Sequence, residues 1–212
     1  MTSIMQTISY NKQNVTGVIL AGGQARRMAG KDKGLLEVAH KPMIEYVLAA
    51  FSGQVGPVII NANRNQSVYA RYHYPVVSDQ LDGYCGPLAG IASAMQHCRT
   101  EFMVTVPCDS PLIPDNLVQR LFQALREQDT DLSVAHNGER LQPVFTLLKC
   151  KLIDSIMDYL TRGERKIDRW FSLHSHTVVD FSDQPDTFLN INTPEDLALL
   201  EQKLRNHNNE DK

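Results

Sequence analysis

Four basic side chains follow a pair of adjacent glycines near the start of the chain. Gly22 and Gly23 come directly after an apolar run at residues 15–20. The basic residues of the loop that follows are Arg26, Arg27, Lys31 and Lys33. Adjacent glycines let a backbone pass close to a phosphate chain with its N–H groups turned inward, and cations neutralise a triphosphate and the charge that develops during its transfer. The segment therefore predicts a triphosphate-binding loop, with a solvated surface turn as the alternative.

The spacing of this loop excludes two common phosphate-binding motifs. A P-loop needs G-x-x-x-x-G-K-[ST], whereas here Gly30-Lys31 is followed by Asp32, and Ala25 stands in the place of the first glycine. A dinucleotide fingerprint needs G-x-G-x-x-G, which residues 22–27 do not supply. Neither a P-loop NTPase nor an ordinary dehydrogenase is favoured.

An aspartate follows the apolar run at residues 102–106 and lies between two prolines. Asp109 occupies the middle of Pro107-Cys108-Asp109-Ser110-Pro111. At a strand end, one carboxylate can hold Mg²⁺ while substrate phosphates and water fill the other coordination positions. The alternative is an Asx turn that caps the next helix. Because Asp109 and the glycine loop both follow strands, we predict that Asp109 is a metal ligand.

Two further polar side chains follow predicted strands and suit recognition of a nucleoside. Asp79 follows the apolar run at residues 75–78, and its carboxylate can accept hydrogen bonds from guanine N1–H and the 2-amino group, or from ribose hydroxyls. Adenine and cytosine lack that pair of donors on one edge. Asn61 follows residues 57–60, and its amide offers both a donor and an acceptor. Turn and capping roles are the alternatives for both residues.

Polar residues in the second half of the chain are candidates for binding an acceptor. Asn190 and Asn192 share one face of a predicted strand, because alternate strand residues point to the same side; a helix cap in the same segment is the alternative. Arg165 and Lys166 follow a predicted helix, where attraction to the helix dipole is the alternative. Further candidates with weaker support are Arg140, Gln142 and Pro143.

Alternating strands and helices must position these residues. Apolar runs of strand length alternate with segments of helical periodicity, which predicts a mainly parallel sheet covered on both faces, with ligands at the carboxyl ends of its strands. The expected strands are residues 15–20, 35–38, 57–60, 75–78, 102–106, 132–135, 143–148, 177–181 and 188–191. The expected helices are residues 42–51, 65–72, 87–97, 114–127, 151–160 and a last one that opens at Pro194. The fold class is therefore α/β, a single-domain three-layer α/β/α sandwich over residues 1–212, with flexible ends at 1–14 and 206–212.

Composition narrows the class of protein. The 212 residues are 42% hydrophobic and 21% charged, which suits a globular domain with a substantial core. A net charge of −3 gives no general attraction to nucleic acid or an anionic membrane, and no apolar run approaches the ~20 residues that span a bilayer. Residues 1–14 are polar and do not form a secretion signal. The four cysteines lack C-x-x-C spacing, which indicates neither a zinc site nor a redox dithiol. We therefore expect reduced thiols in a cytoplasmic protein.

Taken in order, the motifs resemble the molybdenum cofactor guanylyltransferase family. The run Leu20-Ala21-Gly22-Gly23-x-Ala25-x-Arg27-Met28, followed by Asp32-Lys33 and Lys41-Pro42, is typical of nucleotidyltransferases that activate sugar phosphates and cofactors. The other matching segments are residues 57–63, Asp79, 86–90, 107–111, 163–166 and 190–195. Two departures, Ala29 for a glycine and Gln24 for a basic residue, fall on loop positions whose side chains need not touch phosphate.

The resemblance implies a Rossmann-like nucleotidyltransferase fold and a division of roles along the chain. The implied GTP-binding residues are Leu20, Ala21, Gly22, Gly23, Lys33, Asn61, Asp79 and Asp109. The implied cofactor is Mg²⁺ on Asp109, and the implied catalytic residues are Lys33, Arg27 and Asp109. The residues predicted to bind the acceptor remain those argued above from the sequence: Arg165, Lys166, Asn190 and Asn192. The implied partners are GTP, the molybdopterin cofactor and molybdoenzyme maturation proteins.

The predicted reaction is GMP transfer from GTP to the phosphate of molybdopterin, which yields the guanine dinucleotide cofactor and pyrophosphate. The acceptor already carries a nucleophilic phosphate oxygen, so catalysis needs positioning and charge neutralisation rather than a general base. The rival enzymes are a CTP-dependent molybdopterin cytidylyltransferase and a sugar-phosphate nucleotidyltransferase. A nucleotide-binding regulator without turnover is the rival from another class, and the retained Lys33 and Asp109 argue against it.

Overall fold

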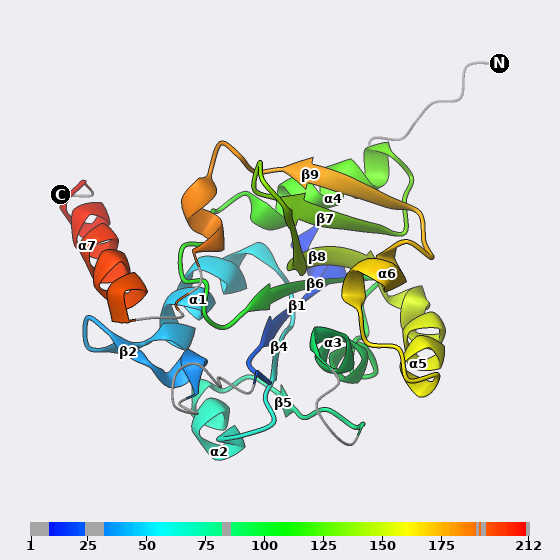
Figure 1. Ribbon diagram of the computed structural model, residues 1–212, viewed down its shortest axis with the longest axis horizontal. Helices are drawn as coiled ribbons and strands as arrows, with labels where there is room; N and C mark the ends of the chain where they lie inside the picture. Colours follow the sequence, from blue (N-terminus) through cyan, green and yellow to red (C-terminus); the bar gives the residue numbers. More distant parts are fainter. Residues whose placement is uncertain (1–8, 24–31, 82–85, 190, 192–193, 211–212) are drawn as a thin grey trace.

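One twisted sheet of seven strands forms the middle layer of the protein (Figure 1). The computed structural model describes residues 9–23, 32–81, 86–189, 191 and 194–210, with side chains up to residue 203. The strand order is β5-β4-β1-β6-β8-β7-β9. The strands are β1 (Val15–Leu20), β4 (Val58–Asn61), β5 (Val76–Val77), β6 (Phe102–Pro107), β7 (Leu132–His136), β8 (Leu141–Lys149) and β9 (His176–Asp180). A separate antiparallel pair consists of β2 (Glu37–Val38) and β3 (Lys41–Pro42).

The pairing of neighbouring strands confirms a mainly parallel sheet. β1 pairs in parallel with β4 and β6, β4 pairs in parallel with β5, and β7 pairs in parallel with β9. β8 runs antiparallel to both of its neighbours, β6 and β7. The start of β8 therefore lies at the sheet edge where β1, β4 and β6 end.

Helices cover both faces of the sheet, which confirms the three-layer α/β/α class (Figure 1). One face is covered by α1 (Met43–Phe51), α2 (Gln66–Tyr69) and α4 (Leu117–Glu127). The other is covered by α3 (Pro87–Met95), α5 (Ile153–Thr161) and α6 (Ile167–Phe171). Along β1, Val15 and Ile19 pack on the first face and Val18 on the second, as the alternation of strand side chains requires. α7 (Pro194–Glu210) lies at the periphery beside β2, where Leu200 packs with Val38 and Met43.

An irregularity interrupts the pairing of β8 with β7. Val134 on β7 lies opposite Thr146, but the next residue, Ala135, lies opposite Gln142. Residues 143–145 therefore have no partner on β7 and form a bulge. Two threonine hydroxyls hold it: Thr105 Oγ1 donates to the Val144 carbonyl at 2.6 Å, and Thr146 Oγ1 donates to the Pro143 carbonyl at 2.8 Å. Pro143 lacks an N–H, and a bulge is one of the few places in a sheet that accepts such a residue.

Most of the expected elements form close to their predicted bounds, and the structure differs from the expectation in four places. Residues 188–191 were expected to form a strand, but Pro185–Phe188 forms a 3-10 turn, η7, closed by Leu189 N–H on the Asp186 carbonyl. Short α6 was not expected, because five residues are too few to show a helical period. The helix expected from residue 114 starts at Leu117, and the strand expected at 35–38 keeps only its last two residues.

Two other expectations concern the C-terminal tail and membrane-spanning helices. The last helix extends to Glu210, past residue 206, where a polar tail was expected. No helix in the described part of the chain combines the length and the apolar character needed to cross a membrane.

Candidate functional site

A lysine and an aspartate meet at the carboxyl end of β6. Lys33 begins the 3-10 turn η3 (Lys33–Leu35), and Asp109 follows Pro107, the last residue of β6. Lys33 Nζ donates to Asp109 Oδ2 at 2.8 Å, and the two side chains are 23% and 12% exposed. A partly buried cation and carboxylate at a strand end form a polar centre that a charged ligand can reach.

The described part of the glycine loop is fixed from both ends. At its start, Ala21 N–H donates to the Asn61 carbonyl at 2.7 Å, and the Leu20 carbonyl accepts from Cys108 N–H at 3.1 Å. These main-chain groups are therefore engaged with the neighbouring segments. Where the chain is described again, Asp32 accepts from Tyr69 Oη at 2.6 Å and from Asn65 Nδ2 at 3.0 Å. Burial raises the pKa of Tyr69, so it stays a hydrogen-bond donor.

Asn61 and Asp79 come together at the ends of β4 and β5. Asn61 is buried, and its Nδ2 donates to Asp79 Oδ1 at 2.9 Å. Asn63 Nδ2 donates to Asp79 Oδ2 at 2.8 Å, and Asn63 Oδ1 accepts from Asp79 N–H at 2.8 Å. Each carboxylate oxygen can accept a second hydrogen bond, so Asp79 is oriented and still able to accept from a ligand.

Sequence reasoning missed Asn63 and Arg64, which support this arrangement. A Cβ at Gly22 would lie 2.9 Å from Asn63 Nδ2, so a larger residue there would displace the amide that donates to Asp79. Arg64 Nη2 donates to the Gly23 carbonyl at 3.2 Å and brings a cation to the glycine loop from the segment after β4. The available signal was the second amide in Asn61-Ala62-Asn63, at the spacing that repeats a strand face.

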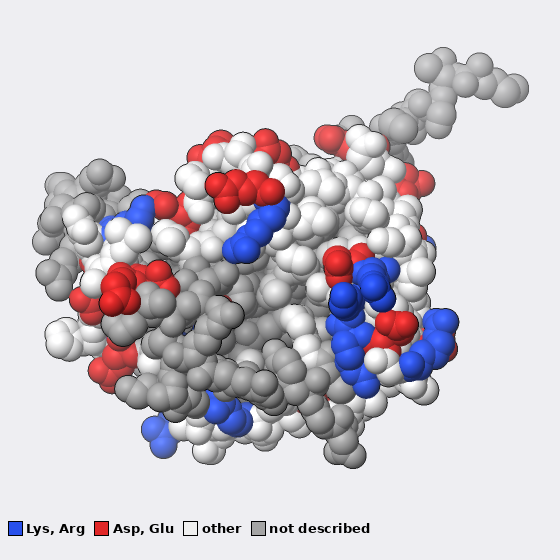
Figure 2. Space-filling view, in the orientation of Figure 1, with Lys and Arg blue, Asp and Glu red and all other residues white. Residues whose placement is uncertain are grey.

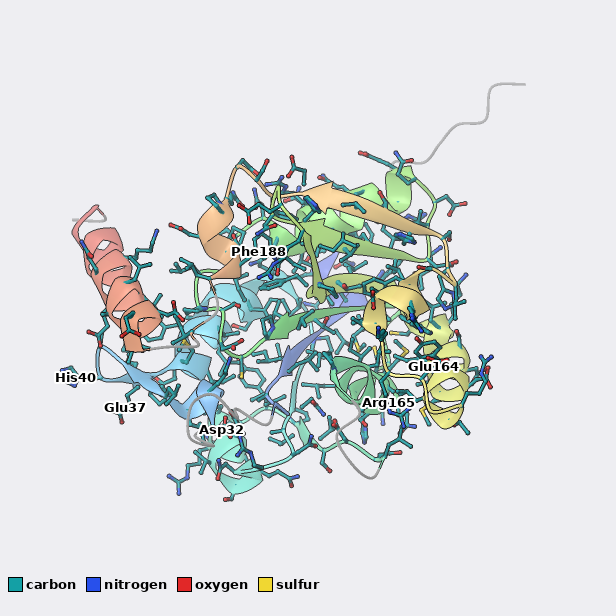
Figure 3. The ribbon with its side chains drawn as sticks, viewed as in Figure 1. Asp32, Glu37, His40, Glu164, Arg165 and Phe188 are labelled. Atoms are coloured by element: carbon teal, nitrogen blue, oxygen red, sulfur yellow. The ribbon has the colours of Figure 1, made fainter. Side chains whose placement is uncertain are left out.

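A cavity of about 220 Å³ lies beside the Lys33–Asp109 pair. Its other lining residues are Pro107, Gln142, Pro143, Val144 and Phe145. β6 and the bulged part of β8 therefore form its walls. Phe145 is supported from behind by Phe188, with ring centroids 5.0 Å apart (Phe188 is labelled in Figure 3).

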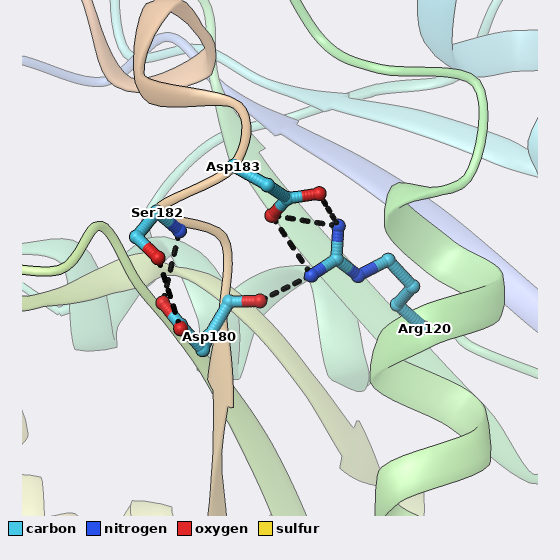
Figure 4. Close-up of polar contacts among 4 residues, drawn as sticks. All are labelled: Arg120, Asp180, Ser182 and Asp183. Atoms are coloured by element: carbon cyan, nitrogen blue, oxygen red, sulfur yellow. Dashed lines mark hydrogen bonds and ion pairs between the residues drawn. The ribbon is translucent and has the colours of Figure 1, made fainter.

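A clamp on the surface fixes the segment that carries Phe188. Arg120 on α4 donates to both carboxylate oxygens of Asp183 and to the Asp180 carbonyl (Figure 4). Its guanidinium carbon lies 4.1 Å from the centroid of the Phe181 ring. Ser182 N–H and Oγ donate to the Asp180 carboxylate, which keeps the turn after β9 closed. Phe188, which supports Phe145 at the cavity wall, therefore follows a segment that these contacts hold in place.

The comparisons with known proteins show the family of the chain. A family model, the MobA-like NTP transferase domain, matches residues 17–178. The molybdenum cofactor guanylyltransferase of Shewanella piezotolerans is 48% identical over 195 residues, which cover 92% of this chain and 96% of that protein. The chain belongs to the molybdenum cofactor guanylyltransferase family.

Other members and solved structures extend this result. The molybdenum cofactor guanylyltransferase of Shewanella woodyi is 50% identical over 186 residues, 88% of this chain and 95% of that protein. The molybdopterin-guanine dinucleotide biosynthesis protein A of Archaeoglobus fulgidus matches with a TM-score of 0.77 at 22% identity, over 90% of this chain and 99% of that one. The 4-diphosphocytidyl-2C-methyl-D-erythritol synthase of Anaerococcus prevotii matches with a TM-score of 0.73 at 13% identity, over 92% and 97%. These structures show the nucleotidyltransferase fold.

The structure describes two of the four residues predicted to bind the acceptor in this guanylyltransferase family member, Arg165 and Lys166. Arg165 Nη1 donates to the Leu160 and Glu164 carbonyls at 2.7 Å. Its guanidinium therefore satisfies a carbonyl in the last turn of α5. Figure 3 shows Arg165 beside α3 and α5, and Asp32 beside α2. Basic side chains gather over α5 and α6 in Figure 2. The exposed basic residues of this region are Arg162, Arg165, Lys166 and Arg169. The predicted site residues Arg27, Asn190 and Asn192 lie outside the described residues.

Proposed function

We propose that the chain transfers GMP from GTP to the phosphate of molybdopterin, with release of pyrophosphate. The carrying observation is the Lys33–Asp109 pair, which lines a cavity between β6 and β8. Asn61 and Asp79 lie at the ends of β4 and β5, on the other side of β1. The identity of 48% with a molybdenum cofactor guanylyltransferase along most of the chain supports GTP and the molybdenum cofactor as the two substrates.

The donor set at Asp109 fits Mg²⁺. Mg²⁺ is commonly bound by one or two carboxylates, with substrate phosphates and water as the remaining ligands. The described residues contain no cluster of three or more carboxylate, histidine or cysteine ligands, so they do not form a metal site made of protein ligands alone. Asp109, one partly buried carboxylate at an accessible cavity, offers the simpler site. Bound there, the ion would supply positive charge to the phosphate oxygens.

The residues of the chain divide the remaining tasks. An oxygen of the acceptor phosphate attacks the α-phosphorus of GTP, a new P–O bond forms, and the bond to the bridging oxygen of pyrophosphate breaks. Lys33 neutralises negative charge on the α-phosphate and on the leaving group, and we assign the same task to Arg27. Asp79, oriented by Asn61 and Asn63, accepts from the guanine edge or the ribose. The main chain of Gly22 and Gly23 contacts the phosphates, because the Ala21 N–H is already bonded to the Asn61 carbonyl. Leu20 and Ala21 hold the start of the loop in place.

The acceptor and the cellular setting complete the proposal. Arg165, Lys166, Asn190 and Asn192 are proposed to hold the distal part of molybdopterin. Because GTP is a cytoplasmic nucleotide, we place the reaction in the cytoplasm, with molybdoenzyme maturation proteins as the proposed recipients of the product.

Pyrophosphate release tests the proposal directly. Purified protein with Mg²⁺ and molybdopterin is given GTP or CTP, and pyrophosphate and the dinucleotide product are measured. We expect turnover with GTP and at least tenfold less with CTP, because cytosine lacks the adjacent donors that Asp79 accepts. Preference for CTP would identify a cytidylyltransferase, and binding of GTP without turnover would identify a regulator.

A further inference from the structure

A buried amide without a partner faces the same cavity as the catalytic pair. Gln142 is 7% exposed, and its Nε2 has no hydrogen-bond partner among the residues that the structure describes. The residue lines the cavity together with Lys33 and Asp109. An unsatisfied buried donor destabilises a folded protein, so its presence at a substrate cavity points to an acceptor atom that arrives with the substrate.

The bulge in β8 is what brings Gln142 to this place. β8 pairs with β6 as far as Thr146 opposite Thr105, and the pairing stops there because residues 143–145 leave the ladder. The two strands separate beyond this point, and the cavity occupies the gap between Pro107 and residues 142–145. Bulges next to active sites commonly redirect a side chain, and the hydroxyls of Thr105 and Thr146 fix this one.

The order of the strands indicates which substrate reaches Gln142. The proposed nucleoside residues, Asn61 and Asp79, lie at the ends of β4 and β5, on one side of β1. Asp109 lies at the end of β6, and Gln142 lies on β8, one strand further in the opposite direction. The sheet edge thus runs from nucleoside to metal ligand to Gln142, which leaves the acceptor as the group on the β8 side.

The size and charge of the cavity indicate which end of the acceptor it holds. About 220 Å³ is less than the roughly 300–1,000 Å³ of pockets that enclose a whole ligand of drug size, so only one end of the acceptor enters. The Lys33 ammonium on the cavity wall favours the anionic end, which is the phosphate monoester.

We propose that Gln142 Nε2 donates a hydrogen bond to a phosphate oxygen of the acceptor and positions the attacking oxygen beside Asp109. This inference rests on the proposed function and adds to it a residue that selects and orients the phosphate end. Gln142 touches the acceptor in this arrangement but exchanges no proton with it.

Two substitutions at Gln142 and one matched control test the inference. Gln142→Met keeps the length of the side chain without the donor, and Gln142→Glu replaces the donor by a negative charge. Gln184→Met is the control, because Gln184 also has a buried unpartnered amide atom but does not line the cavity. The measurements are kcat and KM for molybdopterin at saturating GTP and Mg²⁺, the Kd for GTP, and the Tm of each free protein.

We expect Gln142→Met to lower kcat/KM for molybdopterin by about 10- to 100-fold, mostly through KM, since a hydrogen bond to a charged group is lost. Gln142→Glu should lower it further, and the GTP Kd should stay within about twofold. Because an unpaired buried donor is removed, the Tm of free Gln142→Met should rise by about 2–6 °C. Gln184→Met should leave both kinetic constants unchanged.

The outcomes separate this inference from the proposed function. If the wild-type protein forms no guanine dinucleotide, the proposed function fails and the role of Gln142 fails with it. If wild-type turnover is present but Gln142→Met keeps the acceptor KM, or weakens GTP binding instead, the role of Gln142 alone is overturned.

Discussion

Asp109 pairs with Lys33 and is proposed to hold Mg²⁺, and its replacement by asparagine separates the effect of charge from that of shape. Asp109→Asn keeps the size of the side chain but leaves the partly buried Lys33 beside a neutral amide. We expect turnover to fall by about 10²–10³-fold, the loss typical of removing one electrostatic contribution to a phosphate or oxyanion transition state. Pyrophosphate release across a range of Mg²⁺ concentrations measures this. Asp115→Asn, at an exposed position shortly before α4, is the control, and turnover of Asp109→Asn within threefold of wild type would contradict the metal assignment.

The thiol of Cys98 has unusual surroundings away from the active site. Its Sγ lies 2.9 Å from Cys150 Sγ, and both cysteines are free, as is Cys108. The expectation of reduced thiols stays a prediction, and Cys85 lies outside the described residues. The hydrogen bond from Cys150 lowers the pKa of Cys98 to about 5, against the opposing effect of burial. The same contact raises the pKa of Cys150.

This lowered pKa predicts the pH profile of alkylation at Cys98. A thiol with a pKa of about 5 is already a thiolate above about pH 6, so its reaction rate with iodoacetamide should be nearly constant from about pH 6 to pH 8. An ordinary thiol, with a pKa near 8.5, gains about tenfold per pH unit over this range. Cys150→Ala removes the largest of the lowering causes, so the pKa of Cys98 should rise and the slope should become steeper. Mass spectrometry of the Cys98 peptide measures the rate, and a tenfold rise per unit in the wild type would refute the lowered pKa.

Helix α3 packs against β4 through a glycine at which two effects compete. Alanine in a helix interior is favoured over glycine by up to about 1 kcal/mol. At Gly90, however, a Cβ would lie 2.4 Å from Oδ1 of the buried Asn61. Asn61 cannot easily yield, because its amide is bonded to Asp79 and the Val77 carbonyl. Overpacking of this kind costs about 1–3 kcal/mol. The clash therefore outweighs the gain in helix propensity, and the substitution lowers the free energy of unfolding.

Gly90→Ala is therefore expected to lower the Tm and to weaken GTP binding together. The link is Asn61, which orients Asp79 and would be displaced by the new methyl group. Gly53→Ala is the matched control, since a Cβ there meets nothing within 4 Å, and it should be neutral or mildly stabilising. Thermal unfolding and a GTP titration of both variants supply the comparison; unchanged GTP affinity in Gly90→Ala would show that Asn61 does not position Asp79.

The same elements show what the sequence alone can predict. Residues 15–20 and 102–106 are continuous apolar runs followed by turn residues, and such local patterns place Asp109 at a strand end without knowledge of the fold. The cavity could not be predicted in this way. It depends on β8 pairing with both β6 and β7 and on the bulge between them, and both are long-range properties.

Individual side chains show the same limit. A basic residue after a helix can bind a ligand or cap the helix end. Only the structure shows that Arg165 donates to the Leu160 carbonyl. Asn63 resembles any turn asparagine until its contact with Asp79 is seen. Gln142 carried weak support in the sequence because its importance depends on a missing partner, and a pattern of residue types does not record hydrogen bonds.

At the scale of the whole molecule, both cores extend at least from β4 to β7. The core on one face joins Ile60 of β4 to Ala135 of β7, and the core on the other joins Ile59 of β4 to Val134 of β7. The proposed nucleotide side and the proposed acceptor side of the sheet edge are therefore parts of one packed body. A ligand that binds only the nucleotide side should stabilise the acceptor side as well, since neither side can unfold without exposing the shared cores.

GTP with Mg²⁺ is accordingly expected to shift one cooperative unfolding transition rather than one of two. At a ligand concentration of 100 times Kd the gain is about 2.7 kcal/mol, and a chain of this length gains about 2–4 °C per kcal/mol, so the Tm should rise by about 5–10 °C. Calorimetry with GTP, with CTP and without nucleotide measures the shift. CTP should move the Tm less, because Asp79 and Asn61 lose the guanine donors. Two peaks, of which GTP moves only one, would show that the nucleotide and acceptor sides are separate folding units and that the shared cores do not couple them.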